Sequence, residues 1–438
     1  MKLLFKVTSS LALLFAAGAV TAEDSNDPTA TFTAKNQYGS VSAGNAFNPS
    51  ISIILDGVFY QDNQNGQADT LLNEVDGTSH LHNHSEEDHG HEHSGLEEGF
   101  NLRETELTIS ATVDNYFDAA ANLALTSSGS VEIEEAWFQT RKLPAGLKIK
   151  AGKFLSGIGY LNDSHPHSWD FTDQNLAYRN LLGVHGLQDT GLQLTWLPDL
   201  SVYTLFGVEA LQGSQEKFGS LVEDGEGLNE HEAGPRLITA FAKVAPDLGY
   251  SHALQLGSWI ALAKQHQEQH GDADTEVPVH TVQGDAQMVG FDAVYKYDNS
   301  AAHGEGDFKL QAEYLLQKKD LNMAFHAETP SVVGAERAFT EDGFYMQGVY
   351  GIAARWQLGL RYDVVGLTNE LKSAGNTLTD WDNSDRWTLA MTWSPTEFSR
   401  LRFQYASADL SIESQSQDVS MWNIQWLMSL GAHGAHKF

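Results

Sequence analysis

From Ser50 onward, apolar and polar residues alternate with a period of two, the spacing at which successive side chains of a β-strand face opposite sides of a sheet. The alternation is clearest in four stretches: 107–113, 355–363, 401–405 and 422–428. In the third of these, Leu401 and Phe403 flank the charged Arg402. The pattern predicts an all-β fold, but a soluble sandwich alternates in the same way, so the period alone does not distinguish it from a membrane barrel.

The connections between the alternating stretches are short and long in turn. Short connections fall near 114–115, 143–146, 197–199, 246–249, 299–307, 353–354 and 394–396. Long polar segments fall at 64–98, 157–186, 212–235, 265–285, 320–342 and 367–384, with 127–130 and 413–418 as shorter members of that set. Short periplasmic turns and long outer loops are typical of outer-membrane barrels, so we expect a transmembrane antiparallel β-barrel.

The alternating segments can be counted, and they predict about 16 strands. They lie near 50–62, 99–114, 117–126, 131–142, 147–156, 187–197, 201–211, 236–245, 252–264, 287–297, 307–318, 343–352, 355–366, 386–393, 400–411 and 419–430. An even number of strands places both chain ends on the periplasmic side, and porins of about 16 to 18 strands enclose an aqueous channel. The barrel is therefore expected over residues 50–438.

The first 49 residues differ from the rest of the chain. Residues 1–22 contain Lys2 and Lys6, then an apolar stretch, then small residues up to Ala22, which is the order of a cleaved secretory signal peptide. Residues 23–49 are polar, small and aperiodic, and we interpret them as a flexible periplasmic segment. No later window approaches about 18 uninterrupted apolar residues, so we expect strands rather than helices to cross the bacterial outer membrane, with its lipid as a partner.

The composition excludes several classes of function. Lys and Arg total 26 against 58 Asp and Glu, a formal charge of −32, which argues against nucleic acid as a partner because binding phosphates needs a cationic face. The absence of cysteine excludes disulfides, thiolate zinc sites and cysteine nucleophiles. No Ser/His/Asp or paired-carboxylate spacing stands out as catalytic, so we do not expect an enzyme. The oligomeric state is left open, a homo-oligomer included.

Four segments carry a resemblance to a known family: GFNLRETELTISATVD, EEAWFQTRKLPAGLKIKAGKFLSGIGYLNDSHPHSWDF, SPTEFSRLRFQY and the ending SLGAHGAHKF. They resemble proteobacterial outer-membrane proteins often labelled zinc-regulated TonB-dependent outer-membrane receptors, over roughly residues 50–438. The resemblance implies an outer-membrane protein linked to zinc. TonB-dependent receptors hold a large plug in a barrel of about 22 strands, whereas 27 residues (23–49) separate the expected signal from the first strand, so TonB-type energy coupling is doubtful.

The block LKIKAGKF and the long loop after it are also similar to phosphate-selective-type porins, in which a third long loop folds into the barrel. In this chain that loop is 157–186, and it contains Asp163, His165, His167 and Asp170. If it folds inward, these residues would stand at a constriction, where rings of charge set selectivity, and they would be metal ligands. The alternative is that His165 and His167 pack beside Trp169 as a structural loop, and the sequence favours neither reading.

The first long loop is rich in histidine. Four acidic residues and six histidines fall within 14 positions. The histidines are His80, His82, His84, His89, His91 and His93. Neutral imidazoles and carboxylates in a flexible segment suit zinc, copper or nickel. We interpret the segment as a metal-capture loop, with Zn²⁺ as the bound or transported ion and no organic cofactor; the alternative is a polar loop whose histidines are incidental.

Other histidines and charges form looser groups. One group combines His266, His270 and His280 with Glu268, Asp272 and Asp274. His231 lies among acids, and His433 and His436 are expected to face the periplasm. Basic residues on polar strand faces could oppose acids across a wet lumen: Lys148, Lys150, Arg355, Arg361 and Arg402 against Glu104, Glu106 and Glu313.

These observations favour an outer-membrane, porin-like channel or receptor for uptake of a divalent metal, zinc first, whose acidic outer loops concentrate cations. Two alternatives remain. One is a metal-sequestering or adhesive surface protein with a closed lumen. The other is an outer-membrane hydrolase, in which a loop serine and a histidine would converge within hydrogen-bond reach.

Overall fold

The computed structural model describes residues 49–77, 96–126, 129–271 and 278–431. By its internal contacts the chain divides into Met1–Asn36 and Gln37–Phe438, and the first unit lies outside the described residues. The expected signal peptide at 1–22 and all but the end of the segment 23–49 also lie outside them, so both stay predictions. The capture loop His80–His93 is outside the described residues as well.

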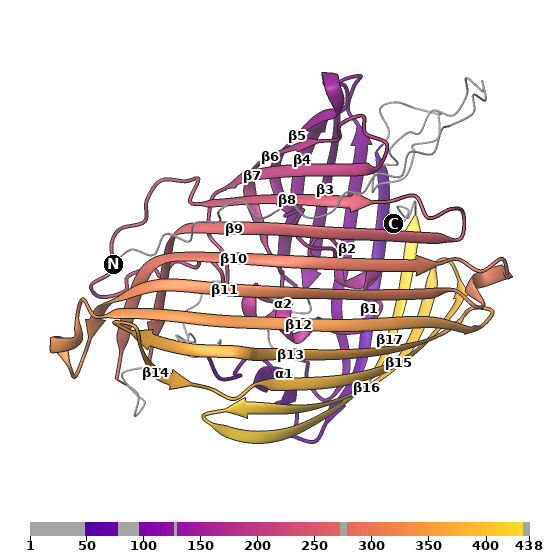
Figure 1. Ribbon diagram of the computed structural model, residues 1–438. Helices are drawn as coiled ribbons and strands as arrows, with labels where there is room; N and C mark the ends of the chain where they lie inside the picture. The colour runs from indigo at the N-terminus through magenta and orange to yellow at the C-terminus, as the bar shows by residue number, and fades with distance from the viewer. Residues whose placement is uncertain (1–48, 78–95, 127–128, 272–277, 432–438) are drawn as a thin grey trace. The chain divides into compact units, whose positions relative to one another are not determined.

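The described part of the second unit is a closed antiparallel β-barrel (Figure 1). Its strands are β1 (Ser50–Asp62), β2 (Gly99–Thr112), β3 (Phe117–Thr126), β4 (Val131–Thr140), β5 (Leu147–Leu155), β6 (Gln188–Trp196), β7 (Tyr203–Leu211), β8 (Leu237–Ala245), β9 (His252–His270), β10 (His280–Tyr297), β11 (Phe308–His326), β12 (Glu336–Ala353), β13 (Trp356–Ser373), β14 (Asn376–Asp380), β15 (Ser384–Thr396), β16 (Ser399–Ile412) and β17 (Gln415–Gly431). Consecutive strands pair with one another, except that β15 pairs with β13 instead of β14, and β17 pairs back with β1 from Ser52↔Gly431 to Asp62↔Met421. The short β14 pairs with β13 beside the ring, which leaves sixteen strands in the barrel and confirms the predicted number.

The two faces of the strands are inverted relative to a soluble sandwich. On β15 the side chain of Arg386 is fully buried inside the barrel, whereas Trp387 is 52% exposed on the outside. On β17 Gln425 is 1% exposed and Trp422 is 58% exposed. A polar interior with an apolar exterior is the arrangement that a lipid bilayer requires. The sandwich alternative is therefore wrong.

The expected outer loops at 265–285, 320–342 and 367–384 are largely strand. β9 continues to His270, and β10, β11, β12 and β13 are lengthened in the same way, so that long hairpins run side by side (Figure 1). Crossing the bilayer takes only about 9–11 residues. Beyond the bilayer both faces of a hairpin contact polar groups, so the apolar alternation ends before the strand does. This is why the segment 265–270 (QHQEQH) was expected to be part of a loop.

Helical segments are short. They are α1 (Ala68–Leu71), α2 (Leu176–Leu181) and the 3-10 turns η1 (Pro144–Gly146), η2 (Pro166–Ser168), η3 (Ala302–Gly304) and η4 (Pro330–Val332). None of the helices in the described residues is long and apolar enough to cross a membrane. Arg355 lies in the turn between β12 and β13 with φ +70° and contacts the carbonyl of Pro395, so its expected place on a polar strand face is wrong.

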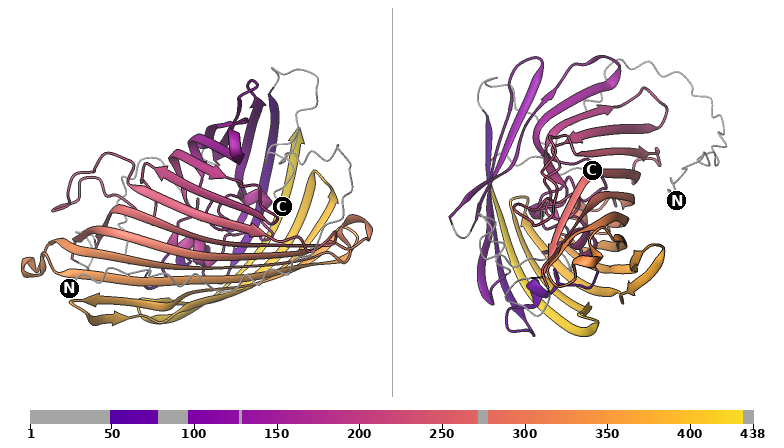
Figure 2. Two further views of the ribbon diagram at one scale, coloured as in Figure 1. Left: turned by 45° about the horizontal axis from the view of Figure 1, so that its top comes forward. Right: turned by 90° about the vertical axis from the view of Figure 1, so that its left-hand side faces the viewer.

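Loops that return into the barrel form an apolar core that the alternation did not predict. Leu72 and Val75 of the first loop, Leu176 and Leu181 of α2, and Phe218 of the fourth loop are all 0–1% exposed and belong to one buried cluster. Burying apolar surface contributes about 25 cal/mol per Å², so this core stabilises the loops inside the ring. In the right-hand view of Figure 2 the magenta segment that carries α2 lies inside the ring of strands.

Candidate functional site

Residues 156–187, which connect β5 to β6 and are called loop 3 here, fold into the barrel. Asn162 closes the base of the loop: its side-chain amide donates to the carbonyls of Ser156 and Leu187, both at 2.9 Å, and its oxygen accepts the Leu187 N–H at 2.7 Å. From this base the loop reaches inward-facing residues on several strands. The structure thus places His165 and His167 inside the barrel, which the sequence left open.

One side of loop 3 is anchored through Asp173. Its carboxylate accepts hydrogen bonds from Arg361 Nη2 at 2.9 Å, from Arg386 Nη1 at 2.6 Å and from Gln404 Nε2 at 2.7 Å. Burial alone would raise the pKa of Asp173, but Arg386 and Arg361 outweigh that effect and lower the pKa below its ordinary value. Arg361, one of the basic residues expected to set a field across the pore, therefore holds the loop in this sector together with Arg386, which was not predicted.

A second anchor involves α2 and the wall strands β11 and β12. Glu313 accepts the N–H groups of Tyr160 and Leu161 at 3.1 and 3.0 Å and the hydroxyl of Tyr178 at 2.8 Å. A Cβ on Gly343 of β12 would meet the Cβ of Ala177 at 2.7 Å, so the helix packs where the wall has no side chain.

Loop 3 is also tied to the first loop through Arg179 of α2. Its guanidinium binds Asp69 Oδ1 at 2.8 Å and Asn73 Oδ1 at 2.6 Å. Loop 3 and the described part of the first loop are thereby joined inside the barrel.

Two histidines of loop 3 contact three carboxylates of the barrel wall. Together these five residues are called the His/Glu cluster: Glu106, Glu134, Glu135, His165 and His167. His165 Nδ1 lies 3.4 Å from Glu134 Oε2, and its Nε2 lies 3.3 Å from Glu135 Oε2. His167 Nδ1 lies 2.7 Å from Glu106 Oε2. The two imidazole rings are stacked with their centroids 5.8 Å apart.

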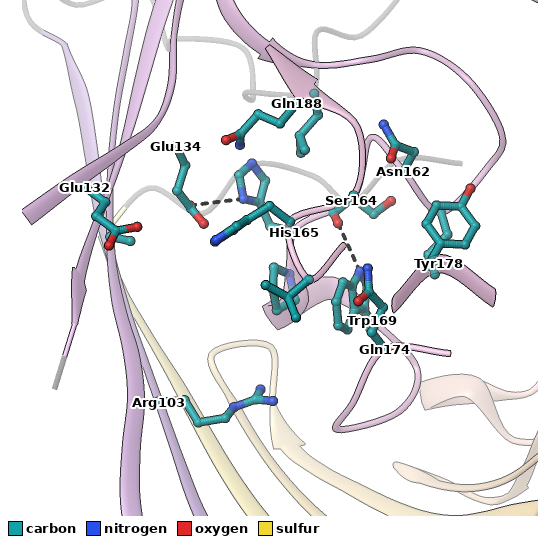
Figure 3. A pocket seen from close by; sticks show the side chains of 17 residues that line it. Arg103, Glu132, Glu134, Asn162, Ser164, His165, Trp169, Gln174, Tyr178 and Gln188 are labelled. Carbon is teal, nitrogen blue, oxygen red and sulfur yellow. Dashed lines mark hydrogen bonds and ion pairs between the residues drawn. The ribbon is translucent and has the colours of Figure 1, made fainter. Parts of the chain in front are cut away.

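Within the described residues, Glu106, Glu134 and His165 are the group whose ligand atoms all lie within 4.8 Å of one another, as a metal site requires. All three residues are buried. Glu134 Oε2 faces the His165 ring at ion-pair distance (Figure 3). Burial lowers the pKa of His165, but the charges of the surrounding glutamates outweigh it and hold the pKa well above the ordinary 6.5. The cluster is therefore buried and rich in carboxylates, and its nitrogen and oxygen atoms are of the kind that could hold a metal ion.

A β-bulge explains how two consecutive glutamates reach the same site. In the pairing of β3 with β4, Asn122 faces Glu135 while Leu123 faces Ile133, so Glu134 is the extra residue. Strict alternation would point only one of the two glutamates inward. Sequence reasoning missed Glu134 and Glu135; the signal was the run EIEE at 132–135, where acids break the alternation.

The other predicted ligands of loop 3 lie elsewhere. Asp170 accepts a hydrogen bond from Lys309 Nζ at 2.8 Å and another from Gln347 Nε2 at 2.9 Å, so it is neutralised by the wall. Asp163 acts electrostatically on Tyr160 and Tyr178 near the Glu313 anchor. The single site expected from Asp163, His165, His167 and Asp170 is therefore divided, and the histidines alone join the cluster.

One serine and one histidine do converge, as the hydrolase alternative requires. Ser220 Oγ lies 3.3 Å from His266 Nδ1, and His266 Nε2 lies 2.5 Å from Glu268 Oε1. However, the Ser220 hydroxyl donates to the carbonyl of Gln267, and His266 Nδ1 already accepts the Gly219 N–H at 3.2 Å. His266 is fully buried, so this geometry fits a loop anchor better than a nucleophile and its base.

The remaining expected groups are distributed as follows. His231 is exposed and lies 3.0 Å from the Val222 carbonyl. His433 and His436 lie outside the described residues, as do Asp272 and Asp274. His266, Glu268, His270 and His280 lie on β9 and β10 rather than in a loop.

No protein-family model matches the sequence. An uncharacterized protein of Aquifex aeolicus (strain VF5) is 33% identical over 402 residues, which cover 90% of this chain and 80% of that protein. The chain belongs to the family of this Aquifex protein. That family relationship assigns no activity, because the relative is itself uncharacterized.

Solved structures are similar to this chain in fold. The chain is similar to the high-pH structure of OprB from Pseudomonas putida, with a TM-score of 0.51 and 11% identity over 87% of this chain and 94% of that one. It is also similar to the outer membrane channel DcaP of Acinetobacter baumannii, with a TM-score of 0.50 and 12% identity over 87% of this chain and 96% of that one. Together with the apolar exterior, the likeness identifies a bacterial outer-membrane barrel of the porin fold. Membership of the zinc-regulated receptor family stays a prediction.

Proposed function

We propose that this barrel is an outer-membrane channel for divalent transition-metal ions, zinc first, and that the ion passes through the His/Glu cluster. One observation carries the proposal: loop 3 holds His165 and His167 inside the barrel against three buried carboxylates of the wall. A transport role is inferred in preference to a catalytic one, because the converging serine and histidine are both engaged by loop backbone.

The donor set of the cluster suits zinc. Imidazole nitrogen and carboxylate oxygen both bind Zn²⁺ at about 2.0–2.2 Å, and Mg²⁺ prefers oxygen ligands alone. Three carboxylates outnumber two imidazoles, so the buried cluster keeps a net negative charge even when both rings are protonated, and uncompensated buried charge is costly. A divalent ion beside Glu134 Oε2 would supply that charge.

The charge of the whole chain also supports a channel for cations. The net charge of −32 would raise the concentration of cations near the mouth of the barrel. The histidines at 80–93 would add selectivity for zinc, copper and nickel over magnesium at the outer surface. This capture role stays a prediction, because that segment lies outside the described residues.

A second candidate function rests on the apolar core inside the ring. Leu72, Leu176 and Phe218 come from three different loops and are buried together, an arrangement that also suits a metal-sequestering surface protein with a closed lumen. A channel lets ions flow through the barrel, whereas a sequestering protein with a closed lumen does not. Only a channel conducts when it is inserted in a bilayer.

Conductance therefore tests the proposal. Purified barrel in a planar bilayer should carry current, and reversal potentials in zinc and potassium gradients should show that zinc permeates. Replacing His165 and His167 by Ala should lower zinc permeation while potassium conductance is largely kept. An anion-selective barrel, or equal losses for both ions in the double variant, would contradict the proposal.

A further inference from the structure

Three histidines form a row across neighbouring strands at the outer end of the barrel. His280 of β10 is the direct register partner of His270 on β9 and of His326 on β11. The His270 and His280 rings are stacked with centroids 4.8 Å apart and an interplanar angle of 6°, and the His280 and His326 rings are 5.5 Å apart at 18°. Directly opposed positions bring Cβ atoms to about 4.5–5.5 Å, close enough for two side chains to share one ion.

Hydrogen bonds determine which ring nitrogen of each histidine carries a lone pair. His270 Nε2 donates to Glu268 Oε2 at 3.1 Å, which leaves Nδ1 with the lone pair when the ring is neutral. His280 Nδ1 donates to the carbonyl of Pro278 at 3.0 Å, which leaves Nε2 with the lone pair. Metal-binding histidines typically donate their second N–H to a carboxylate or a backbone carbonyl in this way.

His326 is arranged differently. Its Nδ1 accepts the backbone N–H of Thr329 at 3.1 Å, so the proton of the neutral ring is on Nε2. To bind a metal, His326 would have to lose that hydrogen bond. His270 and His280 therefore each keep a ring nitrogen with a lone pair. Because the two rings are stacked and nearly parallel, one of them has to turn about its Cβ–Cγ bond before both lone pairs point at one ion.

The carboxylate behind His270 is itself fixed. Glu268 is buried and pairs with Lys319 Nζ at 3.1 Å and with His266 Nε2 at 2.5 Å, and Lys319 also lies 3.3 Å from Glu341. His266, Glu268 and His270 are two residues apart in turn and share one face of β9. Glu268 is thereby positioned to orient His270.

From this geometry we propose a second metal-binding site, in which His270 Nδ1 and His280 Nε2 chelate one divalent ion of the zinc, copper or nickel class. Two imidazoles leave further coordination positions to water, which suits an ion that is bound and later released. The site is distinct from the His/Glu cluster, and it would bind metal whether or not the barrel conducts.

Calorimetric titration of Zn²⁺ into the full-length, folded barrel in detergent tests the proposal. The parent for this experiment carries Ala at the six histidines of 80–93, so that the capture loop does not contribute. His270→Ala and His280→Ala should each bind one equivalent fewer than the parent, or bind that equivalent at least about tenfold more weakly. His326→Ala should change the affinity much less than either.

The matched control is His252→Ala, a histidine of the same strand that is exposed and bonded to Tyr295 instead. It should leave the titration unchanged. Heat-dependent electrophoretic migration checks that each variant is folded, and His270→Gln and His280→Gln replace any Ala variant that does not assemble. Full zinc binding by the folded His270 and His280 variants would overturn the proposal.

A parallel His165→Ala variant separates this site from the proposed function. Loss of one zinc equivalent in the His165 variant, with none lost in the His270 variant, would reject the outer site and leave the channel proposal standing. The reverse result would support the outer site and would contradict metal binding at the His/Glu cluster.

Discussion

The attachment of loop 3 to the barrel wall can be weakened at one residue, Asp173. The change Asp173→Asn keeps the shape of the side chain and removes the charge that Arg361 and Arg386 bind. Breaking a buried ion pair costs roughly 3–5 kcal/mol. Both arginines keep Asp363, at 3.0 and 2.7 Å, and the Asp173 side chain is 17% exposed, so we expect about 2 kcal/mol, reduced for solvent screening.

A loss of about 2 kcal/mol should raise the population of detached loop roughly 30-fold, since each 1.4 kcal/mol is a factor of ten. In single-channel recordings the Asp173→Asn barrel should show larger and more frequent conductance fluctuations than wild type. Asp199→Asn, in the exposed periplasmic turn between β6 and β7, is the charge-matched control. Identical traces for wild type, Asp173→Asn and the control would refute the view that this carboxylate holds the loop.

The lowered pKa of Asp173 gives the same anchor a pH signature. Because its pKa in the folded protein is below the value of about 3.9 for an unfolded chain, the stabilisation is fully present above pH ~4 and is lost as pH falls through the folded value. Wild type should therefore keep its loop attached at pH 5 and begin to fluctuate only in stronger acid. Asp173→Asn should lack that acid transition, and an unchanged transition would assign it to another group.

Three further results are expected. Deleting His80–His93 should weaken zinc binding measured by titration calorimetry but leave the barrel assembled; an unchanged zinc affinity would reject the capture role. Gly343→Val should destabilise the packing of α2, by about 1–3 kcal/mol, because a Cβ there meets Ala177 at 2.7 Å; faster proteolysis within loop 3 checks it, and wild-type resistance would contradict it. Glu134→Gln should reduce zinc permeation about tenfold, measured as zinc current with potassium current as the control; undiminished zinc current would exclude this carboxylate from the pathway.

The regular part of the barrel was predictable from the sequence because the bilayer imposes one rule on every strand. Trp422 outside and Gln425 inside β17 follow that rule, and so do the number and order of the strands. The rule fails where the bilayer ends. The outer half of β9 is polar on both faces, so neither the length of the strand nor the alignment of His270 with His280 could be predicted without the pairing register.

Of the candidate site, the sequence predicted the two histidines of loop 3 but not their partners on strand β4. A His-x-His motif in a long third loop marks His165 and His167, but their partners come from strands separated from them by 30 residues or more, such as Glu135. Asp170 looked equivalent to the histidines by spacing alone. Its position beside Lys309 depends on how the loop turns after η2, which no local pattern records.

Two of the β-bulges in the barrel wall contribute to the attachment of loop 3. On β2, Arg103 is the extra residue between Leu102 and Glu104 in the pairing with β1, and its guanidinium contacts the carbonyl of Thr172. On β4, Glu134 is the extra residue, and its carboxylate faces His165. A bulge re-aims a side chain at the cost of ladder hydrogen bonds, and such features are over-represented next to functional sites. Two bulges in neighbouring parts of one wall, each directing a charge to the same inward loop, argue that the wall is shaped to hold loop 3 in a defined position, as a selective constriction requires.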